Sequence, residues 1–226
     1  MQKLINYFIL FTTVICASST LLQGEIRGRV DVGPVYAAID ILESGKTVET
    51  LYMKGVKGDA NILVYQGLTI KPSFIWTSGH GELTSGTIAL GYYIPITPKF
   101  SILPNFGMTW SYLHTKVSFE ELGLFHLKER FRSESPFLGL DVSYSITEKL
   151  TIIAMYQYAW SHTHTKITDL GGSKSHSCGP NYSLGLDYSL NKHWSITLGA
   201  GYNITLSKEK HGLRGKGIKL GVAYYF

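Results

Sequence analysis

The chain has 226 residues, of which 44% are hydrophobic and 13% aromatic, and it contains 24 glycines and two cysteines. So many apolar residues exclude a disordered chain, two cysteines exclude a disulfide-stapled miniprotein, and the glycines disfavour a coiled coil or helical repeat. The formal net charge is +5, from 21 basic and 16 acidic residues. The composition favours a single domain built from strands.

The N-terminus has the pattern of an export signal. Lys3 precedes an apolar run over residues 4–16, which leads into the small residues Ala17, Ser18 and Ser19. We expect cleavage after Ser19, so that residues 1–19 are the signal peptide, with Gly24 as the second possible end. An uncleaved membrane anchor is the alternative, for which the segment is short. Cleavage removes Lys3, which lowers the net charge from +5 to +4, and leaves Cys178 as the only thiol.

The rest of the chain alternates between large apolar and small polar residues. In residues 194–206 the even positions carry Trp, Ile, Leu, Ala and Tyr, and the odd positions carry Ser, Thr, Gly and Asn. A period of two over this length exceeds the strands of soluble sandwiches and meets the roughly 9–11 residues that a membrane-spanning strand needs. A small polar face opposite a large apolar face is typical of the lumen and the lipid-facing wall of a narrow barrel.

The same pattern predicts ten antiparallel strands after the signal peptide. The first two cover residues 26–41 and 53–65, and the third covers 69–77. Seven more follow, separated alternately by tight turns at 95–98, 146–149 and 190–193 and by longer polar segments. We expect outer loops near residues 43–52, 78–84, 116–130, 166–177 and 208–216. An eight-stranded barrel with an N-terminal extension is the alternative, because the second strand alternates poorly at residues 62–64.

The closing strand carries a resemblance to a known class. It ends in Gly221-Val222-Ala223-Tyr224-Tyr225-Phe226, and with the signal peptide and the alternating hairpins it resembles a Gram-negative outer-membrane β-barrel. Phe226 and Tyr224 resemble the signal that the barrel-assembly machinery reads. In size the chain is similar to the OmpX/Ail and omptin/Opc groups, and residues 128–133 look like those of envelope proteins of chlamydia-like bacteria. The resemblance implies an outer-membrane location, with outer-membrane lipid, lipopolysaccharide and the assembly machinery as partners and no nucleic acid.

Charged residues also fall on the small, inward-facing side of the predicted strands. Three are acidic and three basic, and all lie near the short-turn ends of their strands: Arg29, Asp31, Lys71, Asp141, Asp187 and Lys219. Balanced charges in a low-dielectric interior favour mutual pairing, because an unpaired buried charge is costly. We therefore expect a filled lumen, with a narrow path for ions or small solutes as the alternative.

The sequence offers no enzymatic motif. Omptin-type proteases need Asp-x-Asp and Asp-x-His pairs on the outer rim, and neither occurs in this chain. Lipid A deacylase barrels need a lipid-facing His and Ser two residues apart, whereas the nearest candidate here is His162-Thr163-His164. A Gly-x-Ser-x-Gly nucleophile elbow is absent as well. We expect a non-enzymatic protein without a cofactor.

Histidines and basic residues collect at the expected outer ends of the strands. His162 and His164 share a strand face and His176 precedes Cys178 by two residues, a spacing that can hold a transition metal. Polar residues that simply collect outside the membrane are the favoured explanation, so we expect no metal site. Basic residues form one patch in the last loop, with a second patch near the outer loop at 116–130; together they comprise Lys208, Lys210, Arg214, Lys216, Lys128, Arg130 and Arg132. Such a patch fits lipopolysaccharide phosphates or acidic host glycans. We expect a surface interaction or adhesion protein and envelope component, with a narrow porin-like channel as the alternative.

Overall fold

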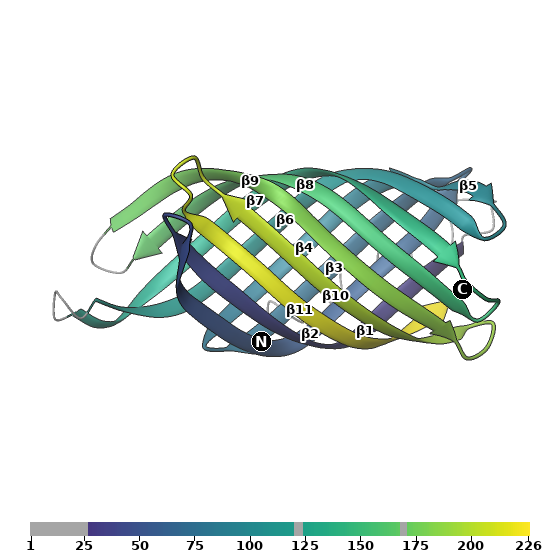
Figure 1. Cartoon of the computed structure of the whole chain (residues 1–226), viewed down its shortest axis with the longest axis horizontal. Coiled ribbons are helices and arrows are strands. Elements are labelled where there is room, and N and C mark those ends of the chain that lie inside the picture. The colour runs from purple at the N-terminus through teal and green to yellow at the C-terminus, as the bar shows by residue number, and fades with distance from the viewer. Residues whose placement is uncertain (1–26, 120–123, 168–170) are drawn as a thin grey trace.

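The computed structural model describes residues 27–119, 124–167 and 171–226, and in this part of the chain every regular element is a strand (Figure 1). The signal peptide expected over residues 1–19 lies outside the described residues. No helix in the described part is long and apolar enough to cross a membrane. The strands are β1 (Arg27–Glu43), β2 (Lys46–Tyr65), β3 (Leu68–Gly79), β4 (Gly81–Tyr92), β5 (Ile94–Thr97), β6 (Phe100–Phe119), β7 (Leu124–Ser145), β8 (Leu150–Ile167), β9 (Gly171–Ser189), β10 (Trp194–Leu206) and β11 (Gly212–Tyr225).

The strands form one closed antiparallel barrel with ten strand positions. β4 and β5 both pair with the same edge of β6, one after the other, so these two segments together count as one strand of the barrel. The barrel closes between the first and last strands, where Arg29 lies opposite Tyr225 and Leu42 opposite Gly212. β1 also pairs with β2 along its length, which excludes the eight-stranded alternative and confirms the ten strands predicted from the alternation.

The two ends of the barrel differ in their connections. At one end, the turn end, the strands join through short turns such as Gln66-Gly67, where φ is 42° and 98°. Two successive positive φ values are those of a type I′ turn, which suits the twist of a hairpin and favours glycine. The chain also terminates at this end, where the Phe226 amide donates to the Gly28 carbonyl at 3.0 Å. We call the opposite end the loop end.

The wall facing outward carries the large side chains expected for contact with lipid. Leu138, Leu184 and Ile218 in its middle band are each more than half exposed. Aromatic residues flank this band as two girdles. The girdle at the turn end includes Tyr65, Tyr92, Tyr144, Tyr188, Trp194 and Tyr224, and that at the loop end includes Tyr36, Tyr52, Trp110, Tyr112, Trp160 and Tyr202.

The strands differ in length, so the loop end has an uneven rim (Figure 1). β3 and β4 have 12 residues each, whereas β6 has 20 and β7 has 22. β4 last pairs with β6 at Thr115, and β10 last pairs with β9 at Cys178, so the outer parts of β6–β9 continue beyond their neighbours. We call this extension the projecting sheet; its described side chains lie on residues 129–135, 161–166 and 171–177. Much of the sequence assigned to loops at 116–130 and 166–177 is therefore strand.

Candidate functional site

Ion pairs cross the lumen at the turn end. Arg29 on β1 contacts Asp187 on β9 at 3.0 Å, although β10 and β11 separate these strands in the sheet. The bond therefore crosses the interior of the barrel rather than running along the wall. Asp187 is only 2% exposed and also accepts a hydrogen bond from the Tyr225 hydroxyl at 2.7 Å. Arg29 contacts Asp31 as well, at 2.9 Å.

A second ion pair also crosses the lumen at the turn end. Lys71 on β3 pairs with Asp141 on β7, with β4 and β6 between them in the sheet. The Asn105 amide donates to the other oxygen of Asp141 at 2.9 Å. Both carboxylate oxygens of Asp141 are thus engaged, as a charge in a low-dielectric interior requires.

The network extends beyond the six charges that the sequence pattern indicates. Lys219 contacts Asp31 at 2.8 Å and Asp59 at 2.9 Å, and Lys57 contacts Asp59 at 3.1 Å. Sequence reasoning missed Lys57 and Asp59. Both lie at odd positions of β2 and continue the inward face, but the poor alternation further along this strand obscured the pattern.

Small hydroxyl side chains line the middle of the lumen on the β4–β8 side. Ser85 and Ser111 lie 2.8 Å apart, and Thr87 and Thr109 lie 2.9 Å apart, each pair across β4 and β6. Ser135 and Ser161 form a similar pair at 2.7 Å between β7 and β8. Such pairs satisfy the hydroxyl groups without charge.

An apolar cluster occupies the lumen at the loop end. Its buried members are Ile39, Leu51, Met53 and Leu113, of which Leu51 is 0% and Met53 1% exposed. Partly buried Ile41, Leu83, Phe131 and Leu213 pack against them. These eight side chains come from β1, β2, β4, β6, β7 and β11, so they meet across the barrel. The lumen is thus crossed by ion pairs at one end and by an apolar cluster at the other.

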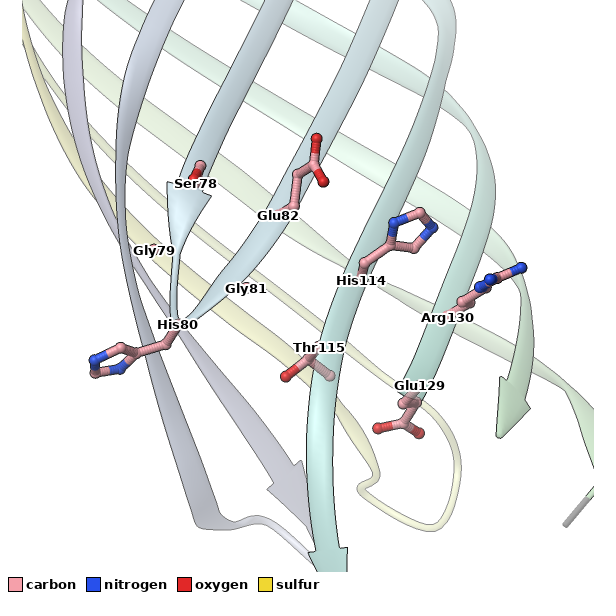
Figure 2. A pocket seen from close by; sticks show the side chains of 9 residues that line it. All are labelled: Ser78, Gly79, His80, Gly81, Glu82, His114, Thr115, Glu129 and Arg130. Atoms are coloured by element: carbon pink, nitrogen blue, oxygen red, sulfur yellow. The ribbon is translucent and has the colours of Figure 1, made fainter. Parts of the chain in front are cut away.

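A pocket of about 430 Å³ lies at the rim where the short β3–β4 hairpin ends (Figure 2). Glu82, His114 and Arg130 lie in a row on one face of β4, β6 and β7, and Glu82 accepts a hydrogen bond from the Trp76 indole at 3.3 Å. Thr115 and Glu129 point to the other face of the wall. The titratable groups of the pocket therefore lie on two faces and do not converge on one point.

Glu129 has the most perturbed carboxyl group at the loop end. Burial, followed by the negative charges of Glu49 and Glu43, raises its pKa from 4.5 to about 7. Each of these influences disfavours the charged form. Glu129 is therefore half protonated near neutral pH, on the inner face of the projecting sheet.

The two predicted basic patches lie apart on the barrel wall. Arg214 pairs with buried Asp40 at 2.6 Å, and Lys216 approaches the same carboxylate at 3.4 Å. Lys208 and Lys210 are exposed in the neighbouring turn. β8, β9 and β10 separate this group from the outward-facing Arg130 and Arg132 on β7, and the side chain of Lys128 lies outside the described residues. Arg132 is held by Glu134 at 3.1 Å and lies 5.7 Å from the Tyr112 ring centroid.

The histidine candidates lie on the outward face of the projecting sheet. His162 is directly opposite His176, and their ring centroids are 4.7 Å apart. Cys178 is exposed and accepts a hydrogen bond from the Tyr158 hydroxyl at 3.2 Å. Among the described residues, no group of three or more His, Cys, Asp or Glu side chains is arranged to hold a metal ion.

The terminal residues Tyr224 and Phe226 both point outward at the turn end. Their rings stack with centroids 6.5 Å apart, and Trp194 packs against Tyr224 at 4.9 Å. Recognition of these residues by an assembly machinery stays a prediction.

Solved structures with a similar fold include outer-membrane barrels of several kinds. The outer membrane protease OmpT of Escherichia coli aligns with a TM-score of 0.58 and 15% identity, covering 92% of this chain and 100% of its own. Ail, the attachment invasion locus protein of Yersinia pestis, gives 0.44 and 13%, covering 90% and 100%. Neisserial surface protein A gives 0.47 and 12%, covering 90% and 98%. At these identities the likeness establishes the fold alone.

A family model identifies the chain more specifically. No curated protein sequence matches it, but the model for Pom, Protochlamydia outer membrane protein, matches residues 42–218, which is well over half of the sequence. That stretch runs from β1 to β11 and includes Asp187 of the turn-end network and Leu51 of the apolar cluster. The chain therefore belongs to the Protochlamydia outer membrane protein family, and it is a β-barrel of the Gram-negative outer membrane.

Proposed function

We propose that this barrel is a non-enzymatic surface interaction protein that binds phosphate- or sulfate-bearing glycans at its loop end. The observation that carries the proposal is the contrast between a lumen crossed by fixed contacts and a basic surface above the membrane. Arg29–Asp187 and Lys71–Asp141 cross the lumen near one end, and the cluster around Leu51 crosses it near the other. A lumen filled in this way leaves the exposed rim as the part that can meet a large partner.

The outward face of the projecting sheet supports this ligand class. Its described charged side chains are Arg130, Arg132, Lys166 and Lys174 against the single carboxylate of Glu134. Because Glu134 is paired with Arg132, the other three cations carry the net charge of the face. Exposed cations in such an arrangement attract anionic groups, and the attraction weakens as salt is added.

The arrangement of the rim pocket supports a non-enzymatic role. General acid–base catalysis needs its groups within hydrogen-bond reach of the same reacting atom. Glu129 lies on the opposite face of the wall from Glu82 and His114 (Figure 2). Glu129, whose pKa is raised, is thus directed away from His114.

Glycan binding is tested with two variants that lose the same number of charges. The first is Arg130→Gln/Lys166→Gln/Lys174→Gln on the projecting sheet. The matched control is Lys99→Gln/Lys149→Gln/Lys192→Gln, whose lysines are exposed at the turn end. We expect the first variant to lose most binding to a soluble sulfated glycan and the control to bind as the wild type does. Equal loss in both variants would contradict the assignment to the loop end.

Two further arms separate the sources of the ligand and the alternative function. Binding to vesicles that contain lipopolysaccharide, but not to the soluble glycan, would identify the same-membrane lipid as the ligand. Channel function is measured as the conductance of the refolded protein in a planar bilayer, beside the variant Asp141→Asn/Asp187→Asn. We expect silence from the wild type; stable conductance that this variant alters would favour the narrow channel instead.

A further inference from the structure

Two histidines from neighbouring strands face each other on the projecting sheet. His162 on β8 lies directly opposite His176 on β9, with ring centroids 4.7 Å apart and ring planes at 82°. Both side chains are exposed on the outward face. They lie beyond the level of Trp160 and Cys178, where the loop-end girdle ends, so both imidazoles meet water rather than the hydrocarbon of the membrane.

We propose that His162 and His176 form a binding site for a borderline divalent metal ion, Zn²⁺ or Cu²⁺. Directly opposed residues of an antiparallel pair have Cβ atoms about 4.5–5.5 Å apart. Two imidazoles on such a pair can converge on one ion, since a zinc–nitrogen bond is about 2.0–2.1 Å long. Imidazole nitrogen suits Zn²⁺ and Cu²⁺, whereas Mg²⁺ and Ca²⁺ prefer oxygen ligands.

The neighbouring strands favour this pair over the same-strand pair of His162 and His164. In register, His162 lies between Glu134 on β7 and His176 on β9. His164 lies between Arg132 on β7 and Lys174 on β9. The first row carries a carboxylate, which Arg132 already pairs, whereas the second carries two positive charges, so a cation meets less repulsion at the first row. The sequence spacing alone does not reveal this difference, because it gives no register.

Glu134 is placed to support the site without binding the metal. Arg132 donates to its Oε1 at 3.1 Å, while the residue itself lies beside His162. A carboxylate that accepts the second N–H of a metal-binding imidazole fixes its orientation and raises its basicity. No group of three ligands is present among the described residues, so water completes the coordination and the ion exchanges readily.

The test titrates the full-length barrel, purified without a histidine tag, with Zn²⁺ or Cu²⁺ in competition with a chromogenic chelator. We expect His162→Gln and His176→Gln each to weaken binding at least about tenfold, because loss of even a supporting residue of a metal site typically costs about 10–100-fold in affinity. His164→Gln and His193→Gln should leave the affinity unchanged, since the first lies between two cations and the second is in a turn-end loop. Mg²⁺ should not compete.

Three outcomes would overturn the proposal. The first is wild-type protein that does not hold either metal more tightly than the double variant His162→Gln/His176→Gln. The second is a loss in His164→Gln as large as that in His176→Gln, which would restore the same-strand pair. The third is loss of binding in Cys178→Ser, which would make the thiol a ligand. Each variant changes only exposed side chains, and an unchanged β-sheet circular dichroism spectrum checks that it folds.

Discussion

The two ends of the lumen are closed by opposite kinds of chemistry. At the turn end Asp187, at 2% exposure, depends on two specific partners, Arg29 and Tyr225. At the loop end Leu51, at 0% exposure, packs among apolar side chains from several strands. A buried charge is stable only while its partners keep their geometry, whereas apolar contact is non-directional. The turn end should therefore be sensitive to the loss of a single group, and the loop end should respond to lost volume.

The largest effect should come from removing one member of the turn-end network. We expect Asp187→Ala to lower the free energy of unfolding by about 3 kcal/mol, because partly buried Arg29 loses one of its two carboxylate partners and keeps only Asp31. Denaturant-induced unfolding in lipid vesicles, followed by tryptophan fluorescence, measures this change. The double variant Asp187→Leu/Arg29→Met should recover much of the loss. If it is no more stable than the single variant, stranded charge is not the cause.

A slightly smaller effect should follow from a cavity in the apolar cluster. Leu51→Ala is expected to cost about 2–4 kcal/mol, the transfer free energy of the lost methyl groups plus that of the cavity. Val48→Ala is the control on the same strand, since Val48 is 55% exposed and its truncation should change stability by less than about 0.5 kcal/mol. Similar losses for the two variants would mean that the cluster is not a packed core.

Conductance tests whether the turn-end ion pairs and the loop-end apolar cluster each block the lumen independently. Lys71→Ala alone should remain silent in a planar bilayer, because the apolar cluster still excludes water, and Leu51→Ala alone should remain silent because the ion pairs persist. We expect the combined variant Lys71→Ala/Leu51→Ala to give brief openings. Conductance of either single variant equal to that of the combination would show that one end alone controls passage.

The smallest effect should be a pH dependence at Glu129. Its pKa is raised to about 7 from 4.5, so the folded protein holds a proton that the unfolded chain releases. Stability from this group is complete below pH 4.5, falls as the pH rises toward 7 and is absent above it. Glu129→Gln should flatten this part of the stability–pH curve. A curve that keeps its slope in the variant would assign the dependence to another group.

The sequence predicts the wall of this barrel better than its contents. Alternation such as that along residues 194–206 and 182–190 assigns the strands, their lipid-facing and lumen-facing sides and their even number, because the lipid-facing wall constrains every second residue. It also marks Arg29 and Lys71 as inward-facing. Alternation does not reveal that Arg29 contacts Asp187 across the lumen. Ion pairs between non-adjacent strands depend on the stagger of all strands in the closed barrel, and a single strand's pattern does not contain it.

The candidate metal site likewise depends on the register between strands, which the sequence does not give. His162 and His164 are equivalent by spacing, and only pairing with β7 and β9 separates a row with Glu134 from a row with Arg132 and Lys174. The alternation also does not predict how short the loops are. Ser44 and Gly45 form a two-residue turn with φ of 50° and 79°, and the following residues 46–50, which are mostly polar, are the first residues of β2.

The uneven rim leaves a strand edge above the membrane. β9 continues for seven residues, Gly171–Ser177, past its last pair with β10, so the backbone amides and carbonyls on that side of the strand face water. An open edge of this kind is a template for unwanted pairing with another chain. Gly171, Gly172 and the exposed Lys174 counter it, because glycine weakens a strand and lysine carries a charge into any added partner. Replacing these three residues with β-branched ones would turn a solvated rim into a site of self-association in the crowded plane of the membrane.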